Sequence, residues 1–207
     1  MTQKRIRQTL TLCPTDWDYE DLVGKNDSLQ IRSWCLDIHN VPVLVRYETY
    51  LPFIYFEFPG PDVSGGKTTW DIYDAEEVHK TLSKAIKDNG RHLDLFKSGD
   101  FVNRKTLYYY QPDTRPMLLL RFRNLRALNH AAAFLRKGLY MPGNRQLAGR
   151  VHLTEIDPIL KMLVDTDLTH TCWFDVKASK VVIPADRISR LANEYICKES
   201  FLPTRSS

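Results

Sequence analysis

The stretch PMLLLRFRNLRALNHAAAFLRKG, residues 116–138, changes its hydrophobic period near its middle from that of a strand to that of a helix. Alternation over Met117–Arg123 predicts a strand with one apolar face and one face that carries cations. The apolar face would hold Leu118, Leu120 and Phe122, and the other face Leu119, Arg121 and Arg123. A helix is predicted over 125–137, ending at Gly138, and its inward side would be formed by Leu125, Leu128, Ala132 and Leu135.

Elements of the same two kinds are predicted on both sides of this stretch. Upstream, the pattern indicates a strand over 53–58, a helix over 75–89 with Asp74 as its N-cap, and a strand over 105–110. Downstream, a strand is expected over 147–153. The order strand, helix, strand, strand, helix, strand is the ferredoxin-like pattern, which also builds the RNA-recognition type of domain. The predicted class is therefore α+β, with a ferredoxin-like (RRM-like) βαββαβ core.

The remaining segments frame this core. A hairpin is predicted from strands over 29–38 and 41–48, joined at His39-Asn40. Residues 1–28 are polar and acidic, which favours an irregular lead-in. A further helix is expected over 156–165, and short strands over 171–178 and 181–183 would pair back onto the hairpin.

The composition is that of an ordinary globular protein. Of 207 residues, 43% are hydrophobic and 26% are charged, which fits neither a disordered nor a fibrous chain. The longest uncharged apolar run, 117–120, is far shorter than a membrane span, and no signal sequence follows Met1, so an intracellular protein is expected. The four cysteines never form a C-x-x-C pair, and His170 with Cys172 is an incomplete ligand set, so no metal site is expected.

Charge is distributed unevenly along the chain, whose net charge is +4. Residues 101–150, here called the basic block, hold 10 Lys/Arg against the single acid Asp113, whereas residues 1–100 and 151–207 have net charges of −4 and −1. Such a block attracts a polyanion, and nucleic acid is the obvious one inside a cell. The alternative is that the acidic flanks balance the block in the folded protein.

Cations and tyrosines of the two predicted central strands could share one surface, on which each stacked base would contribute about 1–3 kcal/mol. The candidate nucleic-acid-binding residues are Arg104, Lys105, Tyr108, Tyr110, Arg121, Arg123 and Arg126. The alternative is that the tyrosines are half-buried sheet residues.

Motifs for catalysis are incomplete. Gly65-Gly66-Lys67-Thr68 lacks the spacing of a phosphate loop, because Pro61 stands where the first glycine is needed. A G-x-S-x-G nucleophile elbow is absent. His152 and Glu155 are interpreted as a local hydrogen bond rather than as an acid/base pair.

A series of ordered landmarks over about residues 29–197 resembles the opening region of family B DNA polymerases from iridovirus-like and marseillevirus-like viruses, of the large nucleocytoplasmic DNA virus type. The landmarks are residues 29–46 (LQIRSWCLDIHNVPVLVR), 51–59 (LPFIYFEFP), 104–112 (RKTLYYYQP), 116–130 (PMLLLRFRNLRALNH), 149–155 (GRVHLTE), 171–174 (TCWF) and 188–195 (ISRLANEY).

The resemblance implies a non-catalytic N-terminal domain that precedes the 3′–5′ exonuclease. It would touch single-stranded template DNA and support the exonuclease and polymerase domains, in cis or in trans, in an infected host cell, in the nucleus or cytoplasm. It also implies an OB-like set of antiparallel strands from residues 29–52 and 171–200, beside a ferredoxin-like subdomain at 53–153 and a connecting helix within 154–170.

No Asp-x-Glu exonuclease motif follows the last landmark, and the Tyr-Gly-Asp-Thr-Asp signature of the polymerase palm is absent. We therefore expect no polymerase or exonuclease activity from this chain alone, and magnesium only in the catalytic domains. Two alternatives stay open: a free-standing RRM-like module that binds single-stranded nucleic acid, and a scaffold protein without nucleic-acid contact. A natural subunit, an expressed fragment and a truncated gene are equally compatible with the sequence.

Overall fold

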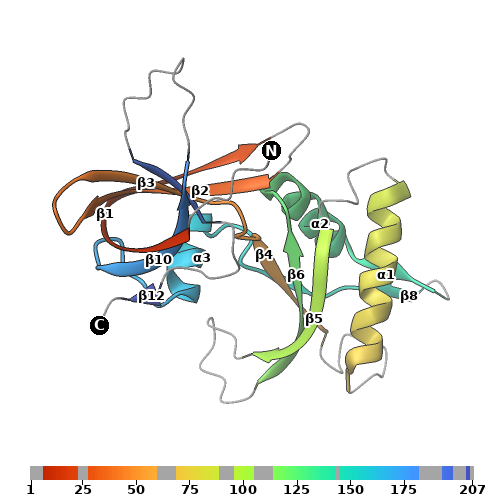
Figure 1. The fold of residues 1–207 in the computed structure, drawn as a ribbon. Coiled ribbons are helices and arrows are strands. Elements are labelled where there is room, and N and C mark those ends of the chain that lie inside the picture. The colour runs from red at the N-terminus through yellow and green to blue at the C-terminus, as the bar shows by residue number, and fades with distance from the viewer. Residues whose placement is uncertain are drawn as a thin grey trace. The chain divides into compact units, whose positions relative to one another are not determined.

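The computed structural model describes residues 7–22, 28–59, 69–88, 96–104, 114–142, 145–181, 193–197 and 204–205. The chain forms two compact units, one of residues 1–50 and 156–207 and one of residues 51–155. In the described ranges, strands predominate and three helices are present, so the α+β class is confirmed (Figure 1). None of these helices is long and apolar enough to cross a membrane.

The first unit is a closed ring of strands in the order β1-β2-β3-β11-β10, because β1 pairs with β2 along one edge and with β10 along the other. The pairing of β3 with β11 is parallel and the other pairings are antiparallel. A short strand, β12, pairs with the start of β10. The strands are β1 Arg7–Leu22, β2 Ser28–Asp37, β3 Pro42–Tyr47, β10 Phe174–Lys180, β11 Glu194–Cys197 and β12 Thr204–Arg205.

Strand β1 can serve two neighbours because it is long and bends. Its register with β2 shifts between Pro14 and Asp16, and such a bulge bends a strand and increases its twist. Leu12 lies at the junction, opposite Asp37 of β2 and Phe174 of β10. Residues 7–12 of β1 therefore pair with β10, and residues 12–22 pair with β2.

Alternation in β2 places the Ser33 and Cys35 side chains inside the barrel, where both form hydrogen bonds. The hydroxyl oxygens of Ser33 and Tyr47 lie 3.1 Å apart, and the Cys35 thiol donates to Ser33 Oγ at 3.3 Å. Trp17 stacks on the Tyr47 ring with centroids 6.0 Å apart. Burial raises the pKa of Cys35 to about 12, since the thiolate would be poorly solvated there.

The second unit contains an antiparallel sheet in the order β5-β6-β4-β9 and a separate hairpin, β7-β8. Along the chain its elements run strand, helix, strand, strand, helix, hairpin, strand. They are β4 Phe53–Glu57, α1 Ile72–Asp88, β5 Phe96–Arg104, β6 Arg115–Phe122, α2 Leu125–Lys137, β7 Leu139–Met141, β8 Arg145–Leu147 and β9 Arg150–His152.

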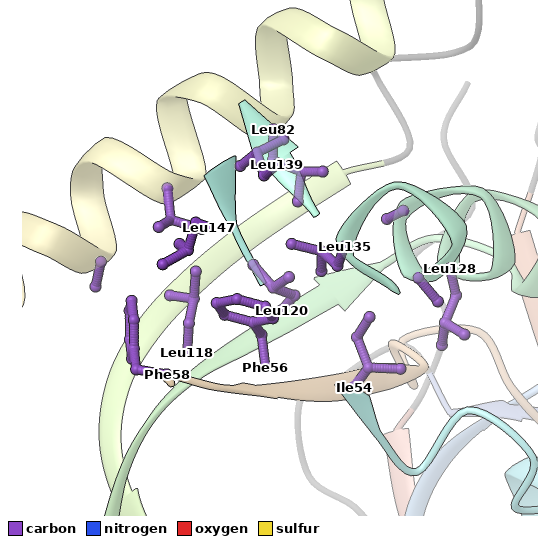
Figure 2. Close-up of a cluster of buried hydrophobic side chains, with 14 of the residues drawn as sticks. Ile54, Phe56, Phe58, Leu82, Leu118, Leu120, Leu128, Leu135, Leu139 and Leu147 are labelled. Carbon is purple, nitrogen blue, oxygen red and sulfur yellow. The ribbon is translucent and has the colours of Figure 1, made fainter. Parts of the chain in front are cut away.

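The core of this unit lies between the sheet and its two helices (Figure 2). Strands β4 and β6 supply Ile54, Phe56, Leu118, Leu120 and Phe122, all fully buried. Helix α1 adds Val78 and Leu82, helix α2 adds Leu128 and Leu135, and the hairpin adds Leu139, Met141 and Leu147. Each such large side chain contributes roughly 1.5–3 kcal/mol through removal of its surface from water.

Helix α1 comes close to β5 at Gly99. A Cβ atom at that position would lie 2.6 Å from His79 Cδ2, so the glycine allows this approach. Burial lowers the pKa of His79, which favours its neutral form.

Several expected elements are present with nearly the predicted bounds. The hairpin is β2 and β3, the strand over 53–58 is β4, the helix over 125–137 is α2, and α1 begins three residues before its predicted start. A third helix, α3 Pro158–Asp165, begins two residues after the predicted one, where Asp157 Oδ1 accepts from the Ile159 N–H at 2.8 Å.

Other expectations differ from the structure. The segment expected to be irregular contains β1, whose acids alternate with Trp17 and Tyr19 as strand residues do. The strand that pairs with β6 is β5, rather than the strand expected over 105–110. Strand β5 was not predicted because Gly99, Asp100 and Asn103 give it a weak strand signature. Residues 105–110 lie outside the described residues. The strand over 147–153 is divided between β8 and β9, and Val181 lies beyond the end of β10, while 182–183 are not described.

The barrel interior predicts a difference in thiol reactivity. Cys35 and Cys197 are buried, whereas Cys13 and Cys172 are partly exposed. At pH 8, we expect iodoacetamide to label Cys35 at least about 100-fold more slowly than Cys172, because the thiol is both covered and protonated. Peptide mass spectrometry of native and urea-unfolded protein measures this ratio, and equal labelling in the native protein would contradict the closed barrel.

Candidate nucleic-acid interface

The described cations among the seven candidates lie at the two ends of strand β6. Arg104 ends β5 and stands opposite Arg115, the first residue of β6. Arg121 is near the other end of β6, Arg123 follows it, and Arg126 lies in the first turn of α2. Lys105, Tyr108 and Tyr110 lie outside the described residues.

These positions do not form one patch. Arg121 lies six residue steps beyond Arg115 along an extended strand, which corresponds to about 20 Å. The structure therefore brings Arg121, Arg123 and Arg126 to one end of the sheet and leaves Arg104 at the other.

Arg121 already has a counterion. Its guanidinium forms an ion pair with Asp100 of the neighbouring strand β5, and both side chains are partly exposed. An exposed pair of this kind contributes little to stability, but it cancels the local positive charge.

Arg115 is held by a buried carboxylate. Glu57 is only 3% exposed; its Oε1 accepts from Arg115 Nη1 at 2.7 Å, and its Oε2 lies 2.7 Å from His152 Nε2. The bond expected between His152 and Glu155 is not found among the described contacts. Strand β9 instead places His152 opposite Tyr55, which lies two residues before Glu57 on β4. Glu155 Oε1 lies 3.6 Å from Arg136 Nη2.

The folded unit thus offsets part of the basic block. Glu57, Asp100 and Glu155 all come from outside residues 101–150, and each pairs with an arginine of the block. The alternative in which acidic flanks balance the block therefore holds at Arg115, Arg121 and Arg136. It does not hold at Arg104, Arg123 and Arg126, because the described part of the chain shows no partner for these three exposed side chains.

Arg123 and Arg126 lie on either side of the start of helix α2. Buried Asn124 is the N-cap, and its Oδ1 accepts from the Ala127 N–H at 2.9 Å. The first turn has no acidic residue, so the positive end of the helix dipole and two cations act together. Such an arrangement favours a phosphate or another anion.

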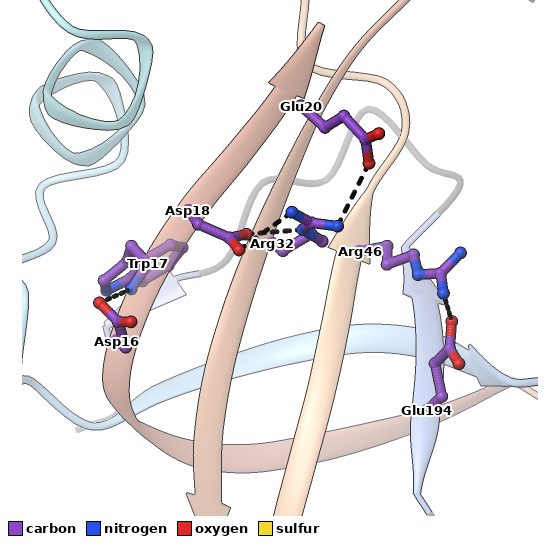
Figure 3. A network of polar contacts seen from close by, with 7 residues as sticks. All are labelled: Asp16, Trp17, Asp18, Glu20, Arg32, Arg46 and Glu194. Carbon is purple, nitrogen blue, oxygen red and sulfur yellow. Dashed lines mark hydrogen bonds and ion pairs between the residues drawn. The ribbon is translucent and has the colours of Figure 1, made fainter. Parts of the chain in front are cut away.

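The outer face of the barrel carries a second charged constellation, which the sequence analysis did not identify (Figure 3). Arg32 Nε and Nη2 donate to Asp18 at 2.6 and 3.0 Å, and Nη1 donates to Glu20 at 3.2 Å. The bonds to Asp18 raise the pKa of Arg32. On the next strand Arg46 forms an ion pair with Glu194. The available signal was the alternation of acids at 16, 18 and 20, which places them on one face of a strand.

The described side chains of this region suit the binding of an anion. Within the described ranges, no group of three or more His, Cys, Asp or Glu side chains is placed to hold a metal ion. The features that remain are cations at a helix start and at a strand end, which suit a phosphate backbone.

Comparison with known proteins relates the fold, but not the sequence, to a known group. No protein-family profile matches the chain, and no curated protein sequence matches it. Among solved structures, the chain is similar to the family B DNA polymerase from the hyperthermophilic archaeon Pyrobaculum calidifontis, with a TM-score of 0.61 and 13% identity. The match covers 90% of this chain and 19% of that chain, so the likeness is one of fold to part of a much longer protein.

The buried carboxylate generates a prediction for stability. Glu57→Gln keeps the shape of the side chain but leaves Arg115 and His152 without their negative partner, so we expect a loss of about 1–3 kcal/mol in urea unfolding. The matched control is Glu155→Gln, which removes an exposed pair and should cost at most about 0.5 kcal/mol. Equal losses in the two variants would show that the Glu57 network does not stabilise the sheet.

Proposed function

We propose that this chain is a non-catalytic, DNA-contacting domain of a family B DNA polymerase, which precedes the exonuclease domain. The observation that carries the proposal is the likeness in fold to a family B polymerase along 90% of the chain. The landmarks between residues 29 and 197 support the same family and further suggest the large nucleocytoplasmic DNA virus type. On this proposal the protein acts in viral DNA replication inside the infected host cell.

The two units support a finer assignment of fold, which is part of the proposal. A ring of five strands in the order β1-β2-β3-β11-β10, with one parallel pairing, supports an OB-like barrel. The sheet order β5-β6-β4-β9, with two helices packed on one face, fits a ferredoxin-like subdomain that carries an additional hairpin.

In this proposal, single-stranded template DNA contacts the start of helix α2. Arg123 and Arg126 neutralise phosphates there, with the helix dipole in support. Arg104 provides a separate contact at the far end of β6, and Lys105, Tyr108 and Tyr110 remain proposed contacts. Arg121 contributes less than its position suggests, because Asp100 neutralises it.

The chemistry of replication is assigned to other domains. Polymerisation and exonuclease cleavage use carboxylates that hold metal ions, so magnesium belongs with the exonuclease and palm, whether these are joined in cis or assembled in trans. This chain would support those domains and guide the template. It would have no nucleotidyltransferase activity by itself.

A free-standing RRM-like module is the second candidate. The sheet order and the placement of both helices on one face favour it, since the RNA-recognition type of domain has the same pattern. The two functions differ in their need for a catalytic partner.

The DNA contact is tested by the double variant Arg123→Ala/Arg126→Ala. Loss of two phosphate contacts should reduce the slope of log affinity against log salt for single-stranded DNA by about 1.4. Fluorescence anisotropy over a salt series measures this slope. The control is Arg121→Ala, which should change it much less because Arg121 is ion-paired; a double variant that binds like the wild type would rule out this contact.

The polymerase assignment is tested by co-purification. From cells that contain the source genome, the tagged chain should recover a protein with the Asp-x-Glu and Tyr-Gly-Asp-Thr-Asp motifs, while the chain alone should neither extend a primer nor degrade DNA with magnesium. Recovery of no such protein, together with DNA binding by the isolated chain, would favour the free-standing module.

A further inference from the structure

The outer face of strands β2 and β3 is the surface that OB-fold proteins use for oligonucleotides. Here that face presents Arg32 and Arg46 directly opposite one another on neighbouring strands. Two adjacent guanidinium groups would attract a phosphate backbone. In this protein both are already engaged by carboxylates (Figure 3).

Arg32 is more fully engaged than Arg46, whose Nε is buried without a hydrogen-bond partner among the described residues. Asp18 binds Arg32 through two oxygens and Glu20 binds its remaining nitrogen, so Arg32 is 27% exposed and its donors face acids. Glu194, whose side chain is only 10% exposed, pairs with Arg46. Three carboxylates therefore face two guanidinium groups, and exposed Asp16 adds a fourth negative charge on the same face of β1.

We infer that Asp18, Glu20 and Glu194 are specificity-determining residues that close the barrel to nucleic acid by occupying Arg32 and Arg46. This inference rests on the proposed OB-like assignment and refines the proposed function, because it directs DNA to the second unit. An intramolecular carboxylate has a high effective concentration and competes well with an incoming phosphate. The net negative charge of the face repels the backbone as it approaches.

The direct test is the full-length triple variant Asp18→Asn/Glu20→Gln/Glu194→Gln. The amides preserve size and some hydrogen bonds but release two cations. Fluorescence anisotropy with an oligo(dT) probe should then show binding tighter on the order of tenfold at low salt, with a salt slope steeper by about 1.4. Adding Arg32→Gln and Arg46→Gln to the triple variant should abolish the gain.

The matched control, Glu76→Gln/Glu77→Gln/Asp167→Asn, changes the net charge by the same amount. Among the described contacts, none of these three side chains has an ion-pair partner. A triple variant that binds no more tightly than this control would overturn the inference. The gain is measured against the control, so it can appear even if Arg123 and Arg126 make no DNA contact and the proposed function fails.

Hydrogen–deuterium exchange on the wild-type protein provides a second measurement, which does not depend on folding of the variants. With saturating oligo(dT), amides of residues 28–37 and 42–47 should keep their exchange rates, because DNA does not lie on this face. Protection confined to these strands would contradict the inference.

Discussion

The main-chain hydrogen bonds between β1 and β10 join residues 7–12 to residues 174–179 and close the barrel. The enclosed interior of the first unit depends on this pairing. A closed ring has no open strand edges between β1 and β10, and it encloses the Ser33, Tyr47 and Cys35 side chains, which satisfy one another's hydrogen bonds. Closure also fixes which side chains face outward. The charged row of Asp18, Arg32, Arg46 and Glu194 lies on four adjacent strands, which the β1–β2, β2–β3 and β3–β11 pairings hold side by side.

The two units differ in whether their outward-facing arginines have ion-pair partners. On the barrel, both arginines of the outer face are paired with acids from neighbouring strands. In the second unit, three arginines of the basic block are paired with acids from outside it, but those at the start of α2 are not paired within the described residues. Under the proposed function, this contrast favours one helix start over the whole basic block as the contact for a polyanion.

The sequence predicted the elements whose hydrophobic period is strong. Helix α2 and the strand before it were found because Leu118, Leu120 and Leu128 repeat at clear intervals. Strand β1 was missed because its outward residues are acids. A run rich in acids indicates a loop unless the residues between them are known to be buried. Strand β5 was missed because it is rich in Gly, Asp and Asn. The partners of Arg115 and Arg121 come from other strands, so no local pattern could reveal them.

The second unit lies in the chain between β3 and α3, and its first and last strands, β4 and β9, are neighbours in the sheet, with Tyr55 opposite His152. An insertion whose two ends emerge side by side imposes little strain on its host. It also sets an order for biosynthesis. Contacts within residues 51–155 can form as soon as that segment leaves the ribosome, whereas the ring waits for strands that are synthesised much later. Until then the outer edges of β1 and β3 lack their later partners, and unpaired strand edges favour misassembly of a nascent chain.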